Sequence, residues 1–536
     1  MKFANKPIIL VERYKFMNLV NRFNKQPLQN LLISIIVIST IIKFSLIGSG
    51  FLSFPDELRY IKSGLALKNL SELEIVSSIS AIFSTKGRPG DAILKTIPNA
   101  FQILSARIFD LNTYESNNSY PLFIFNYIIF CLILLVHYKF SKLVLQNSFL
   151  ALISVVFFSS LTNSYLYIRH SLPYDASLLI LYSVIFKTST YTQNEILSFK
   201  MSFIIGIISF FGYLVYPGYF PLFIISLFLF FFNNLTIKNL SKKIYHSIYY
   251  ILGSIFCLAV FEVFSRIGNG SFIMDSLSLS STVIQGSFEE SFTFIVKYLF
   301  EVEGLIGIFL IIWMAIFFVL ALYILKKRSF KQHSIIILCG FSITILFLSY
   351  AGAGYFLHKV VFYGRLLHQY FPFVCIFSIF TINELFKNNQ YNKIFLFSIS
   401  ILFIVNFCFQ FNQYISFSYP RDIGWELNKT NNLNDIEYTC EYEDSWSVIP
   451  INDDEKNIKL KNDTYSSPKV ILINGCYIYP ANNISKYHPF IPKPNEVLVK
   501  SKPHFMNFKA YQYEGYGDNE RSIMDKMQIQ IKIFQR

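Results

Sequence analysis

Long apolar runs separated by short polar segments fill the chain up to residue 411. Each run approaches the ~20 residues that an α-helix needs to cross the hydrocarbon core of a bilayer. The pattern predicts about eleven membrane-spanning helices, near residues 29–50, 121–138, 149–167, 173–190, 201–215, 218–235, 246–265, 303–325, 334–350, 370–386 and 393–411.

Two pairs of these runs are joined by very short turns that contain proline. The segment RHSLP links 149–167 to 173–190, and YPGY links 201–215 to 218–235. Exposed backbone is costly in lipid. We therefore expect both turns to be buried in protein or to line a cavity.

A different pattern marks residues 51–120, the loop after the first run. Its charges are mixed, and apolar residues recur at helical spacing, with Lys95 and Arg107 off their face: Ile93, Ile97, Phe101, Leu104 and Ile108. This spacing predicts an amphipathic helix in the plane of the membrane interface, which Pro98 is expected to kink.

The pattern changes again in residues 412–536. RDIGWELNKTN (421–431) is typical of a helix, and four short segments separated by Asn, Asp, Pro and Gly predict strands: EYTCEYE, KVILINGCYIY, NEVLVKS and MQIQIKIF. The expected fold is an α-helical polytopic membrane protein with a small C-terminal α/β or α+β domain.

Composition supports a membrane protein, because 53% of the residues are hydrophobic and only 15% are charged. A soluble domain carries about a quarter charged residues. The net charge of +14 does not indicate nucleic acid, because the basic residues gather in alternate loops. They are Lys2, Lys6, Arg13, Lys15, Arg22, Lys25, Lys139, Lys142, Lys187, Lys200, Lys238, Lys242, Lys243, Lys326, Lys327, Arg328, Lys331, Lys387 and Lys393.

That distribution matches the positive-inside rule and predicts a cytoplasmic N-terminal segment, residues 1–28. The domain 29–411 then spans the membrane, and loops 51–120, 164–173, 266–302 and 351–369 and the tail lie outside. The first run has no small-residue cleavage site, so we expect it to be a retained helix. Lys43, late in that run, is expected to reach outward to the interface.

The seven cysteines divide between the two parts of the chain. Five lie in apolar runs, where free thiols act as small hydrophobic groups. Cys440 and Cys476 lie in predicted strands of the outer domain, where an oxidising compartment would let them pair. No spacing resembles a zinc site.

Ionisable residues gather in three outward-facing segments at one membrane level. The segments are PDELRY (55–60), with Lys86 and Arg88 later in its loop, YIRHSLPYDAS (167–177), and GYFLHKVVFYGRLLHQYFPF (354–373). They carry Asp56, Glu57, Arg169, His170, Asp175, His358, Lys359, Arg365 and His368. Ionisable groups at a bilayer boundary indicate function unless they are otherwise satisfied.

The acid pair after the first span, the amphipathic loop, the acid beginning the fourth span and the outer tail domain together resemble the GT-C membrane glycosyltransferases. The resemblance is to bacterial members similar to protein mannosyltransferases and lipid A aminoarabinose transferases (glycosyltransferase family 39-like), with PDELRY the most specific motif. FKAYQYEGYGDNER (508–521) also resembles a tail segment of some bacterial members. The resemblance implies transfer of a sugar from a polyprenyl-phosphate donor to a lipid, glycan or protein on the outer face of the bacterial cytoplasmic membrane.

By this resemblance Asp56 is the base that takes the acceptor proton, and Glu57 orients the site or binds the acceptor. Asp175 matches the family's second acidic position, with His170 and Tyr174 beside it. Fixed cations should stabilise the phosphate leaving group. The candidates, in order of preference, are Arg365, then Lys86 and Arg88, then Arg169, with His358 and His368 as further candidates.

Each assignment has a structural alternative. Asp56 and Glu57 could begin a surface helix, Asp175 could cap the helix after Pro173, and Arg365 could be an interfacial anchor. Lys86 and Arg88 could contact only lipid headgroups, and the histidines favour a hydrogen-bonded structural role. Many family members carry another clear acid in the first outer loop. Here Glu72, Glu74 and Asp91 compete for that place, so the need for a divalent metal stays open.

Two other functions fit parts of the pattern. An O-antigen-type polymerase or ligase would use Arg and His in a late outer loop such as 354–373, but it leaves the acids at 56, 57 and 175 unexplained. A transporter or flippase predicts charges at broken helices in mid-membrane, whereas the ionisable residues of this chain collect at the ends of the predicted spans. The sequence does not identify the sugar or the acceptor, because pocket shape sets that choice.

Overall fold

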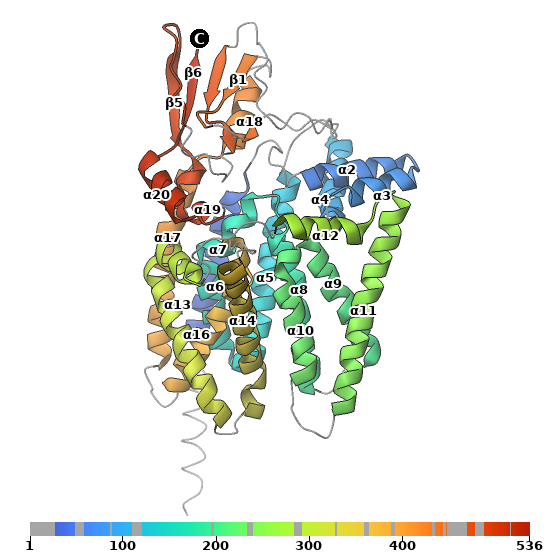
Figure 1. Ribbon diagram of the computed structural model, residues 1–536. Helices are drawn as coiled ribbons and strands as arrows, with labels where there is room; N and C mark the ends of the chain where they lie inside the picture. Colours follow the sequence, from blue (N-terminus) through green and yellow to red (C-terminus); the bar gives the residue numbers. More distant parts are fainter. Residues whose placement is uncertain are drawn as a thin grey trace, which may run out of the picture.

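The computed structural model describes most of the chain as helices that form one bundle, with a small sheet at one end (Figure 1). The described residues are 27–48, 58–85, 88–109, 120–194, 198–232, 240–283, 292–326, 330–357, 364–386, 392–430, 435–442, 446–447, 469–477, 487–514 and 516–536. Asp56, Glu57, Lys86, His358 and Lys359 lie outside them.

Apart from residues at its ends, the described part of every predicted apolar run is helical, although the run 149–167 is divided among three helical segments. The first lies in the helix Pro27–Leu46, whose last turn is the 3-10 helix η1 (Phe44–Leu46). The others are α5 (Tyr120–Leu145), α6 (Ser148–Ser160), α7 (Thr162–Tyr165) with η3 (Leu166–Arg169), α8 (Tyr174–Asn194), α9 (Phe199–Val215), α10 (Phe220–Phe232) after η4 (Pro217–Tyr219), α11 (Leu240–Ile267), α13 (Phe294–Lys326), α14 (Phe330–Leu357), α16 (Phe371–Leu385) and α17 (Asn392–Ser416).

Six of the described helices are long and apolar enough to cross a membrane, or up to seven if the bent pair Ser148–Ser160 and Thr162–Arg169 counts as one span. Three more are apolar but shorter, namely Phe199–Val215, Pro217–Phe231 and Phe371–Leu385. The described helices are therefore those of a helical membrane protein. The number of eleven spans stays a prediction.

The predicted span 149–167 is not one straight helix. It bends by 78° between Ser160 and Thr162, where Leu161 adopts an extended conformation. Short hydroxyl side chains flank the break, and such side chains compete with helical backbone hydrogen bonds. Glu303 of α13 accepts the freed backbone N–H of Asn163 at 3.4 Å. The break is thus stabilised by a neighbouring helix.

Helix α13 also contains an irregularity. Gly304 has φ 60° and ψ −132° inside it, a conformation that favours glycine. The helix changes direction at this glycine. It begins at Phe294, nine residues before the predicted start of its span.

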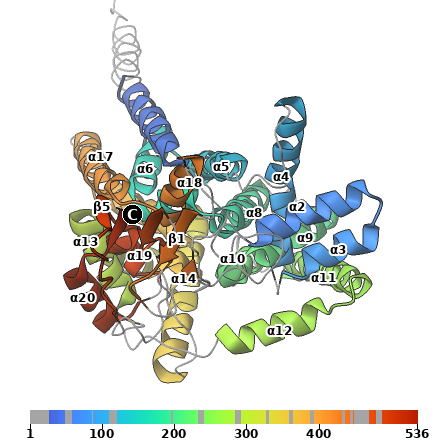
Figure 2. The same ribbon diagram turned by 90° about the horizontal axis from the view of Figure 1, so that it is seen from above.

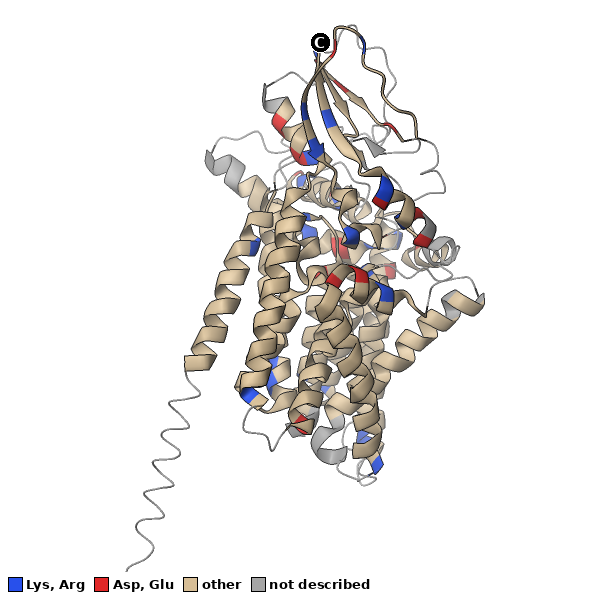
Figure 3. Cartoon of the chain, turned by 90° about the vertical axis from the view of Figure 1, so that its left-hand side faces the viewer, with Lys and Arg blue, Asp and Glu red and all other residues tan. Residues whose placement is uncertain are grey.

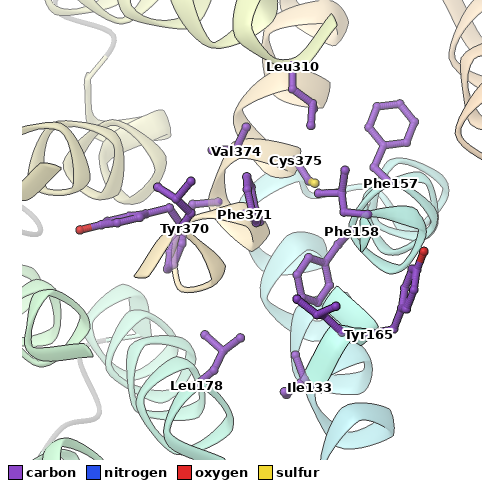
Figure 4. Close-up of a cluster of buried hydrophobic side chains, with 14 of the residues drawn as sticks. Ile133, Phe157, Phe158, Tyr165, Leu178, Leu310, Tyr370, Phe371, Val374 and Cys375 are labelled. Atoms are coloured by element: carbon purple, nitrogen blue, oxygen red, sulfur yellow. The ribbon is translucent and has the colours of Figure 1, made fainter. Parts of the chain in front are cut away.

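The bundle core consists of aromatic and aliphatic side chains from α5, α6, α8, α13 and α16 (Figure 4). Phe157 stacks on Phe403 with ring centroids 3.9 Å apart. The prediction that Lys43 reaches outward is wrong, because its side chain is fully buried, with Nζ 4.1 Å from the Phe407 ring centroid. A cation over an aromatic face retains part of the stabilisation that water would give.

Four helices lie across the end of the bundle, in the layer nearest the sheet (Figures 1 and 2). They are α2 (Leu58–Ser71), α3 (Ile75–Phe83), α4 (Pro89–Phe109) and α12 (Phe272–Val283). Helix α4 buries its polar residues Asp91, Lys95 and Asn99 and exposes Ile97 and Phe101. An exposed apolar face over a buried polar one fits the predicted interfacial helix, and Pro98 lies within it.

The C-terminal region contains a four-stranded mixed sheet in the order β1-β3-β6-β5. Strand β1 (Ile436–Thr439) pairs in parallel with β3 (Val470–Ile473), while β6 (Gln530–Gln535) pairs antiparallel with both β3 and β5 (Val497–Pro503). Helix α18 (Pro420–Thr430) packs Ile423 and Leu427 against one face of this sheet.

Smaller elements complete this region: β2 (Trp446–Ser447), β4 (Cys476–Tyr477), η8 (Phe505–Asn507), α19 (Lys509–Gln512) and α20 (Asp518–Met527). Cys440 and Cys476 form a disulfide that joins the segment after β1 to β4.

Charged residues are distributed unevenly along the bundle. Figure 3 shows Lys and Arg both near the sheet and at the opposite end of the bundle, whereas Asp and Glu lie mainly in the part near the sheet. The middle of the bundle is almost without charge in this view. A band without charges between two charged ends is what a bilayer requires.

Candidate functional site

The turn between η3 and α8 is the centre of the candidate site. Ser171 and Pro173 of this turn are buried, and Arg169, His170 and Leu172 are partly buried, which agrees with the prediction that RHSLP lies in protein. Other elements bind its backbone: Asn126 of α5 donates to the His170 carbonyl at 2.6 Å, and Lys95 of α4 donates to the Ser171 carbonyl at 2.7 Å. Hydrogen bonds from α5 and α4 thus fix the backbone of the turn.

Asp175 lies in the first turn of α8 and is 4% exposed. Neither carboxylate oxygen accepts a hydrogen bond from the part of the chain that the structure describes. The ring of His368 lies beside it, with Nε2 3.4 Å from Asp175 Oδ1. Buried carboxylates are nearly always hydrogen-bonded, so this one indicates a site for a polar ligand. No capping bond supports the structural alternative for Asp175.

His368 is positioned by Tyr219 of η4. Its Nδ1 lies 2.9 Å from the Tyr219 hydroxyl, and that hydroxyl also donates to the Arg365 carbonyl at 2.9 Å. Both residues belong to α15 (Gly364–His368), so Tyr219 fixes the orientation of this short helix. The YPGY turn thereby positions a residue far from it in sequence.

Arg365 extends from α15 toward Tyr174 and the C-terminal region. Its Nη1 donates to the Tyr174 hydroxyl at 2.8 Å, and its Nε lies 4.0 Å from Glu514 Oε2. The Arg365 side chain is 26% exposed and that of Glu514 is 19% exposed, so both can meet a ligand. A partly exposed arginine can bind a phosphate through two parallel hydrogen bonds.

Glu514 brings an acid from the C-terminal region into this cluster. The Tyr167 hydroxyl donates to its Oε1 at 2.8 Å. Burial raises the pKa of Glu514 to about 7, although the Arg365 charge and the Tyr167 hydrogen bond oppose the increase. The side chain can approach because Gly364 has no Cβ: an added Cβ would lie 2.8 Å from Glu514 Oε1.

Arg88 lies against the same group of aromatic residues. Its guanidinium is 5.4 Å from the Tyr216 ring centroid, and the rings of Tyr216 and Tyr174 are 4.7 Å apart in an edge-to-face contact. Arg365 is 5.8 Å from the Tyr174 ring. The structure thus places two of the predicted phosphate-binding cations against one tyrosine pair, Arg88 at Tyr216 and Arg365 at Tyr174. We name Tyr174, Asp175, Arg365, His368 and Glu514 the site cluster.

Arg169 and His170 belong to a second group, which joins the bundle to the C-terminal region. Arg169 forms an ion pair with Asp422 of α18 at 2.7 Å and lies 4.1 Å from the Tyr419 ring. His170 Nε2 is 2.6 Å from the Tyr511 hydroxyl and 2.9 Å from that of Tyr419. We name these five residues the docking cluster.

Burial, with Arg421 and Arg169 nearby, lowers the pKa of His170 well below its usual range. The ring is therefore neutral near pH 7 and able to exchange hydrogen bonds with both tyrosines. This agrees with the structural role that the sequence favoured for the histidines.

The segment that flanks the acids at 56 and 57 leads to the same turn. Arg59, in the first turn of α2, pairs with Asp91 at 2.6 Å, and Asp91 pairs with Lys95, which donates to Ser171. On the other flank, a Cβ on Gly48 would lie 3.3 Å from the Asp422 carboxylate. The described residues on both sides of the 49–57 segment thus lie close to the turn that carries Asp175.

Asp91 also clarifies the three acids that compete in the first outer loop. It is 2% exposed and holds two cations, whereas Glu72 and Glu74 are exposed. Within the described ranges, no group of three His, Cys, Asp or Glu side chains could hold a metal ion. The need for a metal stays open.

Four residues of the two clusters were not identified from the sequence: Tyr419, Asp422, Tyr511 and Glu514. Tyr219, which positions His368, was not identified either. Glu514 lies in FKAYQYEGYGDNER, so the segment was found but the residue was not. Tyr219 is the last residue of YPGY, where a buried turn was predicted without a role for its hydroxyl. Asp422 gave no signal beyond being an acid at the start of a helix.

The chain was also compared with known proteins. No protein-family model matches it, and no curated protein matches it.

Proposed function

We propose that the protein is a membrane glycosyltransferase that moves one sugar from a polyprenyl-phosphate donor to a hydroxyl of a lipid, glycan or protein acceptor. The observation that carries the proposal is Asp175, a buried carboxylate without a hydrogen bond from the described residues. It follows Tyr174, whose hydroxyl accepts a hydrogen bond from the partly exposed Arg365. A sugar hydroxyl is a ligand that such a carboxylate would bind. The GT-C resemblance supplies the reaction.

In this reaction the acceptor oxygen attacks the anomeric carbon of the donor sugar, and the bond from that carbon to the phosphate oxygen breaks. The acceptor proton passes to the Asp56 carboxylate, and polyprenyl phosphate leaves with the bonding electrons. Attack opposite to the leaving group inverts the configuration. A positioned base of this kind contributes about 10²–10⁴-fold to a rate.

The cations of the site are assigned to different roles according to the residues that they contact. Arg365 and Arg88 contact the tyrosine pair and are assigned to the donor phosphate, together with Lys86 of the same loop. Arg169 is less suited, because its charge is already compensated by Asp422. Asp175 and Tyr174 are assigned to the acceptor, while His170 connects to the C-terminal region through two tyrosines.

The proposed location is the bacterial cytoplasmic membrane, with the site cluster and the sheet on its outer side. The uncharged band in the middle of the bundle and the basic end away from the sheet favour this orientation (Figure 3). The donor would reach the site from the outer leaflet, at the level of helices α2, α3, α4 and α12 (Figure 1).

Glycan analysis of a deletion strain tests the proposal. The strain should lose one sugar from an envelope glycan, lipid or protein, and the wild-type gene should restore it. Asp56→Asn should fail to restore it while reaching the membrane at normal levels. Asp525→Asn, which removes the charge of an exposed acid paired with Lys509, should restore it fully.

Two outcomes would contradict the proposal. A deletion strain whose envelope glycans are unchanged would remove the transferase function. Normal restoration by Asp56→Asn would instead favour a polymerase or ligase that works through the arginine and histidines of residues 354–373.

A further inference from the structure

We infer that Glu514 competes with the donor phosphate for Arg365, so that the C-terminal region carries an internal anion that occupies the phosphate position when no donor is bound. This inference rests on the proposed function, because it names a role for a residue of the same site. The observations are the ion-pair distance of 4.0 Å between Arg365 Nε and Glu514 Oε2 and the partial exposure of both side chains.

The segment that carries Glu514 is fixed to α15 by its backbone. The Gly364 N–H donates to the Tyr513 carbonyl at 3.0 Å. The Gly364 carbonyl accepts from Asn163 Nδ2 at 3.2 Å, and the same nitrogen donates to the Tyr298 hydroxyl at 2.8 Å. The carboxylate therefore comes to Arg365 on an anchored segment.

The site also allows Glu514 to release Arg365. At 4.0 Å the pair is longer than a direct hydrogen bond, whereas the Tyr167 hydroxyl binds Oε1 at 2.8 Å. Glu514 can thus keep its tyrosine contact while Arg365 turns to another anion. A phosphate would offer Arg365 the bidentate geometry that the present pair lacks.

Protonation should decide the competition. Because burial raises the pKa of Glu514 to about 7, the side chain is mostly neutral at about pH 6 and mostly charged at about pH 8. The other groups around it are Arg365 of α15, Tyr167 of η3, Tyr298 of α13 and Tyr219 of η4, beyond which lie His368 and Asp175. Arginine and buried tyrosines keep their protons over this range. Donor binding should therefore weaken as pH rises.

The test uses the full-length protein in lipid nanodiscs and a polyprenyl methyl phosphate as probe. This probe is a phosphodiester like the donor, so its single charge does not change over the range. Wild-type protein should bind it about tenfold more weakly at about pH 8 than at about pH 6. Glu514→Gln should bind equally at both pH values and as tightly as the wild type at the lower one.

Two further variants control the test. Asp525→Asn removes an acid of the same C-terminal region that pairs with Lys509, and it should follow the wild type. Tyr167→Phe removes the hydrogen bond that favours the charged form of Glu514, so the loss of binding should move to higher pH.

The outcomes separate the two proposals. If Glu514→Gln loses affinity with pH as the wild type does, or binds more weakly at both pH values, the competition is disproved while phosphate binding stands. If the wild type does not bind the probe at either pH, the proposed function fails and the inference fails with it.

Discussion

The docking cluster and the site cluster lie on either side of the same turn, but they differ in how closely their charged groups are paired and hydrogen-bonded. In the docking cluster, Arg169 is paired with Asp422 at 2.7 Å, and the His170 ring bonds two tyrosines. In the site cluster, Asp175 accepts no hydrogen bond from the described chain, and the Arg365–Glu514 pair is stretched to 4.0 Å. Arg169 and Arg365, which are both phosphate-binding candidates in the sequence, thus differ in how fully their charges are paired.

The energetic reason is general. The Arg169–Asp422 pair is partly buried, at a direct distance of 2.7 Å. Breaking such a pair is costly to the extent that it is shielded from water, because removing one partner leaves a charge without compensation. Such a pair therefore positions the C-terminal region reliably. A buried acid without partners is itself costly, and folding gains nothing from it. Its retention is explained most simply by a ligand that supplies the missing contacts.

The largest expected effect comes from the disulfide, which supports the docking side. Cys476 belongs to β4, and its carbonyl lies 3.1 Å from His504 Nε2; the next residue, Phe505, stacks on Tyr419 at 4.6 Å. Replacing Cys440 and Cys476 by serine should destabilise the C-terminal region by about 3 kcal/mol, because the bridge closes a long loop.

Limited proteolysis of the full-length protein measures this effect. Cleavage C-terminal to residue 430 should become faster, while cleavage within the bundle should not change. Cys408→Ser, which removes an exposed free thiol in α17, is the control. Equal acceleration in both parts would show that the disulfide supports the whole protein rather than one side of the turn.

The second prediction compares two isosteric changes of an acid. Asp422→Asn breaks the ion pair with Arg169 and should lower stability by about 2 kcal/mol, with little effect on the rate of transfer by the folded protein. Asp175→Asn removes a carboxylate without a described hydrogen bond, so stability should be unchanged or higher. Its rate of transfer should fall by about 30-fold, the value of a hydrogen bond to a charged group.

Thermal melting and the transfer assay, run on both variants, give the result. If Asp175→Asn melts much earlier than the wild type, Asp175 is a structural residue. If Asp422→Asn abolishes transfer while melting normally, the docking cluster takes part in the reaction.

Much of the fold could be predicted from the sequence, because bilayer thickness and polar turns constrain it strongly. The positions of the helices and the four main strands follow from apolar runs and from short β-branched segments. The break at Leu161 could not be predicted, since it depends on Glu303 from a helix distant in sequence. The burial of Lys43 depends in the same way on Phe407.

The residue types of the candidate site and their membrane level could be predicted from the sequence. The partner of each charged side chain could not. The sequence placed Arg365 before Arg88 and Arg169 as a phosphate-binding candidate, but it gave no partner for any of the three. Only the tertiary structure places Asp422 beside Arg169 and tyrosines beside the other two. Glu514 was not identified because nothing in the sequence of the C-terminal region indicates that this acid contacts residues of the helical bundle. Asp56 and Glu57 lie outside the described residues, so their convergence with Asp175 stays a prediction.

The most direct measurement compares Arg365→Gln with Arg169→Gln in binding of polyprenyl methyl phosphate. Both variants lose one guanidinium, from opposite sides of the same turn. Measured in nanodiscs well below the melting temperature, Arg365→Gln should bind at least about tenfold more weakly than the wild type, with its melting temperature little changed. Arg169→Gln should bind normally and melt earlier. Unchanged binding by Arg365→Gln, with loss of binding by Arg169→Gln, would show that the donor phosphate is bound on the other side of the turn.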